Sequence, residues 1–148
     1  AVHKAGIIHG DLKPQNVMVM GSGVAKLMDF GVARTRAHQE HGGVSVVGTP
    51  LYMSPEQAKG ADLDERSDIY SAGVMMFEMF TGVCPFEARE VAEILQMHLS
   101  DAPPDPRSIR PDIPAALAEI ILACLAKHRA QRPATALDLD RWLMRVRV

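Results

Sequence analysis

Residues 9–16 read His-Gly-Asp-Leu-Lys-Pro-Gln-Asn, and thirteen residues after Asn16 the chain reads Asp29-Phe30-Gly31. In the first stretch the carboxylate of Asp11, the ammonium of Lys13 and the amide of Asn16 lie within six residues. The carboxylate of Asp29 follows a short predicted hairpin, which can fold it back on the same place. This combination of groups favours a site at which a small anionic group is transferred.

Each of these side chains suits one part of a phosphoryl-transfer reaction. Asn16 and Asp29 offer two oxygen ligands, which suit Mg²⁺ because that ion takes its remaining ligands from phosphate and water. Lys13 can contact a transferring phosphoryl group as a point charge. Asp11 is left to orient an attacking hydroxyl and to accept its proton.

The rest of the chain predicts a mainly helical α+β fold. Two apolar runs, 17–20 and 24–28, flank Gly21-Ser22-Gly23 and predict a short β-hairpin near the N-terminus. Residues 34–48 are polar and aperiodic, which predicts a long loop. Residues 101–114 hold five of the ten prolines, which predicts a segment without regular structure.

The spacing of apolar residues predicts four helices, over residues 68–81, 87–99, 117–125 and 139–146. The first is apolar on nearly all sides and is therefore expected to be buried, with Gly82 ending it. Thr135 and Asp138 are expected to cap the last helix at its N-terminus.

Composition narrows the class of protein. The 148 residues are 47% apolar and 23% charged, which is typical of one soluble globular domain and excludes disorder, collagen and a disulfide scaffold. A net charge of −2 predicts no nucleic-acid partner. Cys84 and Cys124 form no C-x-x-C pair and predict two buried thiols in a reducing compartment. The longest apolar stretch, 69–83, is shorter than the ~20 residues of a membrane span. We therefore expect a cytoplasmic segment without membrane contact. A longer protein that contains this segment could still be anchored to a membrane elsewhere.

Together the motifs resemble the C-terminal lobe of a bacterial (Hanks-type) serine/threonine protein kinase. The family pattern is H-R-D-L-x-x-x-N, then D-F-G, then A-P-E. Here the first motif is intact except for Gly10, the second is intact, and the third appears as Ser54-Pro55-Glu56. The resemblance covers essentially all of residues 1–148, with a catalytic loop at 9–16 and an activation segment at 29–56.

The resemblance implies a role for each residue of the first two motifs. Asp11 is the expected catalytic base, and Lys13 is expected to contact the γ-phosphate of ATP. Asn16 and Asp29 are expected to hold Mg²⁺, with Mn²⁺ as a possible substitute. The implied reaction transfers the γ-phosphoryl group of ATP to serine or threonine hydroxyls of proteins.

The resemblance also implies roles outside these motifs. Thr49 matches the loop threonine that hydrogen-bonds the catalytic aspartate and lysine, with a structural turn as the alternative. Met18 matches the residue that closes the adenine pocket from below, with a place in the hairpin core as the alternative. His9 and Phe30 resemble members of the apolar stack that aligns the lobe.

Three further residues resemble structural supports. Glu56 resembles the glutamate that pairs with a distant arginine, here Arg132. Asp68 resembles the aspartate that opens the central helix and braces the catalytic loop.

Gly10 is the main departure from the pattern, because the family has an arginine there that receives an activation-loop phosphate. We therefore expect activity to depend only weakly on phosphorylation of Thr35 or Ser45. His-Gly-Asp also resembles small-molecule kinases of the aminoglycoside or choline type. Those kinases typically lack D-F-G and a stretch like residues 49–56, so a protein substrate is favoured.

A second departure is that the sequence contains no complete G-x-G-x-x-G loop and no V-A-I-K lysine. Those motifs belong to the N-terminal lobe, which covers the nucleotide. Since the sequence also begins with Ala1, we expect a piece of a longer chain that is inactive when isolated. The alternative from another class is a non-catalytic module that docks a partner through the predicted helix at 87–99.

Overall fold

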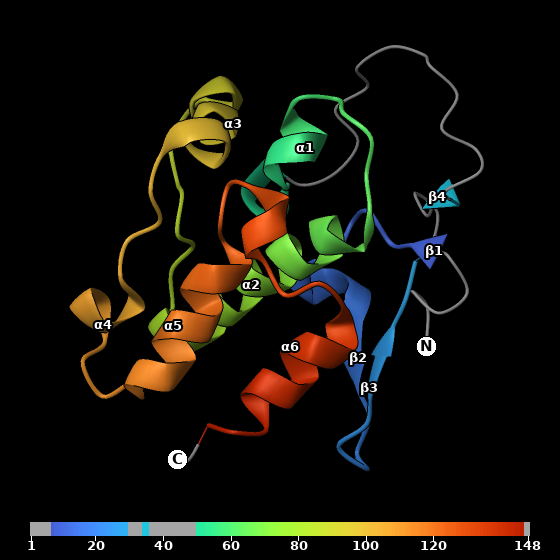
Figure 1. The fold of residues 1–148 in the computed structure, drawn as a ribbon, viewed down its shortest axis with the longest axis vertical. Coiled ribbons are helices and arrows are strands. Elements are labelled where there is room, and N and C mark those ends of the chain that lie inside the picture. Colours follow the sequence, from blue (N-terminus) through green and yellow to red (C-terminus); the bar gives the residue numbers. More distant parts are fainter. Residues whose placement is uncertain (1–6, 30–33, 36–49, 147–148) are drawn as a thin grey trace.

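The computed structural model describes residues 7–29, 34–35 and 50–146. The helices gather on one side of the molecule and the short strands lie on the other (Figure 1). This arrangement confirms the predicted α+β class with a mainly helical body.

The described strands form two antiparallel two-stranded sheets. β2 (Val17–Val19) pairs with β3 (Ala25–Leu27), which confirms the predicted hairpin. β1 (Ile7–Ile8) pairs with β4 (Arg34–Thr35). The prediction of a loop throughout 34–48 was therefore wrong at its first two residues, because a distant strand supplies their backbone partners. Residues 36–48 lie outside the described part of the chain.

The described residues also form six α-helices and three 3-10 turns. The helices are α1 (Pro55–Ala58), α2 (Glu65–Thr81), α3 (Val91–Ser100), α4 (Pro106–Ile109), α5 (Ala115–Cys124) and α6 (Ala136–Leu143). The turns are η2 (Pro14–Asn16), η3 (Pro50–Tyr52) and η4 (Arg129–Gln131).

α2 runs through the centre of the helical body (Figure 1). It begins three residues before the predicted start, because the Asp64 carboxylate accepts a hydrogen bond from the Arg66 N–H at 2.8 Å. Gly82 ends it as predicted, with a left-handed φ of 83° that glycine adopts without steric cost. Met79 is 70% exposed, so the last turn is not buried on all sides as expected.

The core lies between α2 and α5. Phe77 and Val74 of α2 are fully buried there, together with Ile121 and Leu125 from α5 and its C-cap. This apolar packing fixes α2 as a rigid support for the segments that lie across it.

The remaining helices match the sequence with shifted ends. Thr135 caps α6 as predicted, since its hydroxyl accepts from the Asp138 N–H at 3.1 Å. The prediction of no regular structure in 101–114 was wrong at α4. There the Asp105 carboxylate caps one turn, and Pro106 occupies the first helical position, where no N–H is needed.

Both cysteines are buried free thiols, as predicted. Among the described residues, no helix combines the length and the apolar character needed to cross a bilayer.

Candidate active site

Helix α2 holds the loop that carries Asp11 through the side chain of Asp68. One oxygen of Asp68 accepts from the His9 N–H and the other from the Gly10 N–H, both at 2.9 Å. Asp68 thus braces this loop, as the family resemblance implies. Gly10 has a φ of 73°, a left-handed conformation in which another residue would be strained.

The ring of His9 connects this loop to the end of the hairpin. Its Nε2 lies 3.0 Å from the carbonyl oxygen of Met28, and its Nδ1 lies 3.3 Å from the Asp11 nitrogen. A carbonyl oxygen only accepts, so Nε2 carries the proton and Nδ1 accepts from the Asp11 N–H. His9 is buried, as expected for a member of an internal stack, but its contacts here are polar.

Three of the predicted site residues lie together. The ammonium of Lys13 is 2.7 Å from Oδ2 of Asp11. The side-chain amide of Asn16 donates to the Asp11 backbone carbonyl at 2.8 Å and to Oδ2 at 3.1 Å. η2 produces this geometry, because its turn brings Asn16 back beside Asp11.

Asp29 is placed beside this cluster by the backbone. The Met28 N–H donates to the Asn16 carbonyl oxygen at 2.8 Å, so the next residue lies close to Asn16. Among the described residues, Asp29 is the one non-glycine residue with a positive φ, at 56°. Such uncommon backbone conformations concentrate at functional sites.

By the chemistry of their side chains, Asn16 and Asp29 are the residues that could hold a magnesium ion shared with phosphate. They offer one carboxylate and one amide oxygen, since the amide nitrogen of Asn16 is engaged by Asp11. In the part of the chain that the structure describes, no group of three or more His, Cys, Asp or Glu residues could hold a metal.

The other predicted site residues are placed less fully. Met18 lies on β2 opposite Lys26 and is 50% exposed, so it does not fill a hairpin core. Thr49 and Phe30 lie outside the described residues, as does Ser45.

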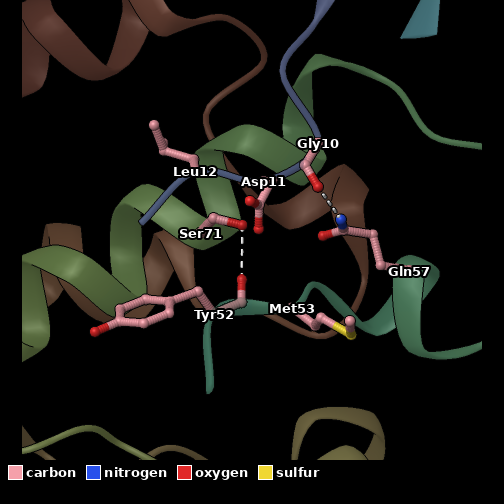
Figure 2. A pocket seen from close by; sticks show the side chains of 7 residues that line it. All are labelled: Gly10, Asp11, Leu12, Tyr52, Met53, Gln57 and Ser71. Atoms are coloured by element: carbon pink, nitrogen blue, oxygen red, sulfur yellow. Dashed lines mark hydrogen bonds between the residues drawn. The ribbon is translucent and has the colours of Figure 1, made fainter. Parts of the chain in front are cut away.

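The carboxylate of Asp11 faces a pocket closed on the far side by the chain that leads into α1. The pocket is lined by Gly10, Asp11, Leu12, Tyr52, Met53, Gln57 and Ser71 (Figure 2). The hydroxyl of Ser71 on α2 donates to the Tyr52 carbonyl at 2.7 Å. α2 therefore holds both walls of the pocket, through Asp68 on one side and Ser71 on the other.

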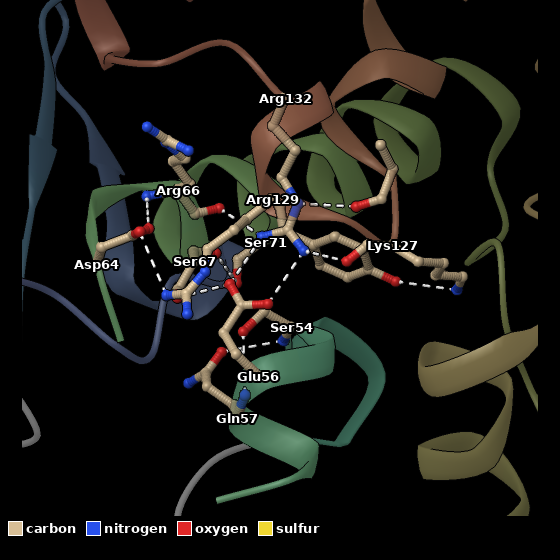
Figure 3. Close-up of polar contacts among 12 residues, drawn as sticks. Ser54, Glu56, Gln57, Asp64, Arg66, Ser67, Ser71, Lys127, Arg129 and Arg132 are labelled. Carbon is tan, nitrogen blue, oxygen red and sulfur yellow. Dashed lines mark hydrogen bonds and ion pairs between the residues drawn. The ribbon is translucent and has the colours of Figure 1, made fainter. Parts of the chain in front are cut away.

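The predicted pair of Glu56 and Arg132 supports α1 (Figure 3). The guanidinium donates to both carboxylate oxygens, at 2.7 and 3.0 Å, and Ser67 donates to the first of them at 2.7 Å. Burial alone would raise the pKa of Glu56, but the hydrogen bonds and charge of Arg132 outweigh it and hold that pKa below its ordinary value.

Sequence reasoning missed several polar supports, among them Ser71, Gln57 and His98. The ring of His98 bridges the hydroxyl of Tyr70 at 2.8 Å and the carbonyl of Leu51 at 3.1 Å. The available signal for Ser71 was its place as a polar residue within the mostly apolar stretch 69–77 of α2. The spacing of Ser54 and Gln57 marks a capping box, but nothing local in the sequence marks the contact of Gln57 with Gly10 or the role of His98.

Comparison with known proteins places this geometry in a family. Residues 1–142 match the family model described as "Protein kinase domain". The chain is 43% identical over 145 residues to serine/threonine-protein kinase pkn3 of Myxococcus xanthus, and the match covers 90% of this chain. It is 37% identical over 147 residues to serine/threonine-protein kinase PknB of Mycobacterium tuberculosis, covering 97% of this chain.

A third relative is the DNA damage-responsive serine/threonine-protein kinase RqkA of Deinococcus radiodurans, 40% identical over 135 residues and covering 89% of this chain. The chain spans only 26%, 24% and 20% of the length of pkn3, PknB and RqkA.

Proposed function

Because this chain belongs to the protein kinase family, we propose that residues 1–148 form the C-terminal lobe of a serine/threonine protein kinase domain. In the full-length protein, the reaction is transfer of the γ-phosphoryl group of ATP to a serine or threonine hydroxyl of a protein. The observation that carries this proposal is the bonded cluster of Asp11, Lys13 and Asn16.

Asp11 is the proposed catalytic base. It orients the attacking hydroxyl and accepts its proton, and its position facing the pocket of Figure 2 supports this role. Two hydrogen bonds from Asn16 restrict Asp11, which favours one geometry for the attack.

Lys13 and the two oxygen donors serve the phosphate groups. The ammonium of Lys13 lies beside the point of attack and stabilises negative charge on the transferring group. Asn16 and Asp29 are the proposed ligands of Mg²⁺ or Mn²⁺, which supplies charge neutralisation for phosphate oxygens when bound.

Two further assignments complete the proposed site. Met18, half exposed on β2, contacts the adenine from below. Thr49 hydrogen-bonds Asp11 and Lys13, an assignment that rests on the sequence motif alone.

The contacts that cover the nucleotide on the side opposite this lobe come from another part of the full-length protein. Protein kinases require a lysine of the N-terminal lobe, in a V-A-I-K motif, that pairs with a glutamate, and the sequence contains neither this motif nor a complete glycine-rich loop. A polypeptide limited to residues 1–148 is therefore expected to be inactive.

The test is phosphorylation of a generic serine/threonine substrate by the full-length protein with ATP and Mg²⁺. We expect Asp11→Asn to lower kcat by about 100- to 10,000-fold, because general base catalysis is lost. Asp140→Asn is the matched control, since Asp140 is exposed on α6 and outside the cluster.

Three results would count against the proposal. Equal activity of the wild type and Asp11→Asn would contradict the role of Asp11. Phosphorylation of an aminoglycoside but not of a protein would instead support the small-molecule kinase alternative, and an inactive wild type would favour a binding module.

A further inference from the structure

Gln57, on α1, has a side chain held at both ends. Its Oε1 accepts from the Ser54 N–H at 3.0 Å (Figure 3), while its Nε2 donates to the Gly10 carbonyl oxygen at 2.6 Å (Figure 2). Ser54 and Gln57 also form a capping box, in which the Ser54 hydroxyl accepts from the Gln57 N–H. A capping box requires only an acceptor here, which glutamate provides equally well. The cap therefore does not account for the amide nitrogen directed at Gly10.

The Gly10 carbonyl belongs to the peptide unit that ends at the nitrogen of Asp11. Because a peptide unit is planar, fixing its carbonyl oxygen also fixes the direction in which the Cα of Asp11 leaves it. The same unit is held at its N–H by the ring of His9, and the preceding N–H is held by Asp68. Among these hydrogen bonds to the loop, the one from Gln57 is the one made by a residue of α1.

α1 is a firm anchor for such a contact. Glu56, the neighbour of Gln57, is tied to the buried guanidinium of Arg132 by two hydrogen bonds. Displacing α1 as a whole would therefore require breaking a buried ion pair, which is costly.

We propose that Gln57 is a positioning residue, which orients Asp11 through the Gly10–Asp11 peptide and so couples α1 to the proposed catalytic base. This inference rests on the proposed function of Asp11. The coupling uses a neutral amide and a carbonyl, and it therefore requires no phosphate on the chain between Asp29 and α1.

The decisive variant is Gln57→Glu in the full-length protein. It keeps the acceptor for the Ser54 N–H, but it places a carboxylate oxygen where an amide donor faced the Gly10 carbonyl. Gln57→Met removes the donor without adding charge. Gln96→Glu is the matched charge control, because Gln96 is exposed on α3 and bonds only locally to Ser100.

We expect Gln57→Glu and Gln57→Met to lower kcat by about 10- to 100-fold, as for small misplacements of a reacting group. The KM for ATP should change less than about twofold, and Gln96→Glu should behave as the wild type. Lowering the pH should raise the rate of Gln57→Glu relative to Gln96→Glu, because the carboxyl group introduced on α1 can again donate to the Gly10 carbonyl once it is protonated. A purely structural cap would not produce that pH dependence.

Hydrogen exchange separates this inference from the proposed function. In Gln57→Glu, peptides covering residues 9–12 should exchange faster than in Gln96→Glu, whether or not the protein phosphorylates the substrate offered. An inactive wild type would contradict the proposed function and leave this readout intact. Unchanged exchange, or an active Gln57→Glu with unchanged kcat, would overturn the positioning role.

Discussion

The guanidinium of Arg132 is fully buried, and all three of its nitrogens donate hydrogen bonds. Besides Glu56, it donates to the backbone carbonyls of Arg66, Ala126 and Lys127, at 2.8 to 3.1 Å. A buried charge of this kind is tolerated because every donor has a partner. Removal of one member of the pair therefore leaves the other as an uncompensated buried charge.

We predict that Arg132→Met lowers the free energy of unfolding by about 3–5 kcal/mol, which is the usual cost of breaking a buried pair. Arg141→Met is the control, because the Arg141–Asp138 pair is exposed and such pairs contribute at most about 1 kcal/mol. Chemical denaturation would measure both. If both variants lowered the free energy of unfolding by a similar amount, burial of the ion pair would not be the reason for its contribution to stability.

At the scale of elements, α2 and α5 lie close together at Gly73. A Cβ added to Gly73 would lie 2.6 Å from the Cβ of Cys124 and 3.4 Å from the Leu125 side chain. The Cβ of Cys124 is fixed by its backbone, so a side chain at position 73 would push the helices apart. Gly73 is thus required for packing, although glycine weakens a helix by ~1 kcal/mol relative to alanine.

We predict that Gly73→Ala destabilises the protein by about 1–3 kcal/mol despite the better helix propensity of alanine, because overpacking outweighs it. Gly21→Ala should be nearly neutral, since nothing lies within 4 Å of a Cβ at that position. Melting temperatures of the two variants test this. A more stable Gly73→Ala protein would show that the helices can separate without cost.

α2 also organises the site through its polar residues. Asp68 binds the loop before Asp11. Ser71 donates to the carbonyl of Tyr52, and Ser67 donates to the carboxylate of Glu56. One rigid helix therefore sets the distance between the two walls of the pocket.

At the scale of the whole molecule, His98 links three segments that are distant in sequence. It sits on α3, bonds Tyr70 of α2 and reaches Leu51 of η3, and it is fully buried. Since the Leu51 carbonyl only accepts, Nε2 carries the proton and Nδ1 accepts from the Tyr70 hydroxyl. Burial, reinforced by the charge of Lys127, lowers the pKa of His98 to about 4.

This pKa predicts that the fold weakens in mild acid. Between pH 6.5 and about 4 the unfolded chain binds a proton at His98 that the folded chain excludes, so stability falls as the pH is lowered through this window. The slope is ~1.4 kcal/mol for each pH unit. Unfolding measured at several pH values should show it, and His98→Gln should flatten the curve in this window. The same substitution at the exposed His128 should leave the curve unchanged.

Below about pH 4.5, protonation of Glu56 causes a second loss of folding stability. Its folded-state pKa is depressed, so its contribution is present above the ordinary value of 4.5 and is lost as the pH falls below it. The two windows are adjacent, which makes stability decline continuously from mild to strong acid.

Much of the fold could be predicted because its signals are local. The hairpin, the cap by Thr135 and the stop at Gly82 each depend on residues a few positions apart. One of the errors was also local. α4 was missed because a capping aspartate before Pro106 outweighs the high proline content around it.

The candidate site divides in the same way. Residue types and spacing alone singled out Asp11, Lys13 and Asn16, and the family resemblance implied the Glu56–Arg132 pair across 76 residues. The contacts of Gln57 with Gly10 and of His98 with Leu51 each join residues 47 positions apart and belong to no local pattern. Only tertiary packing decides them, because a side chain's partner across such a distance depends on where whole elements come to rest.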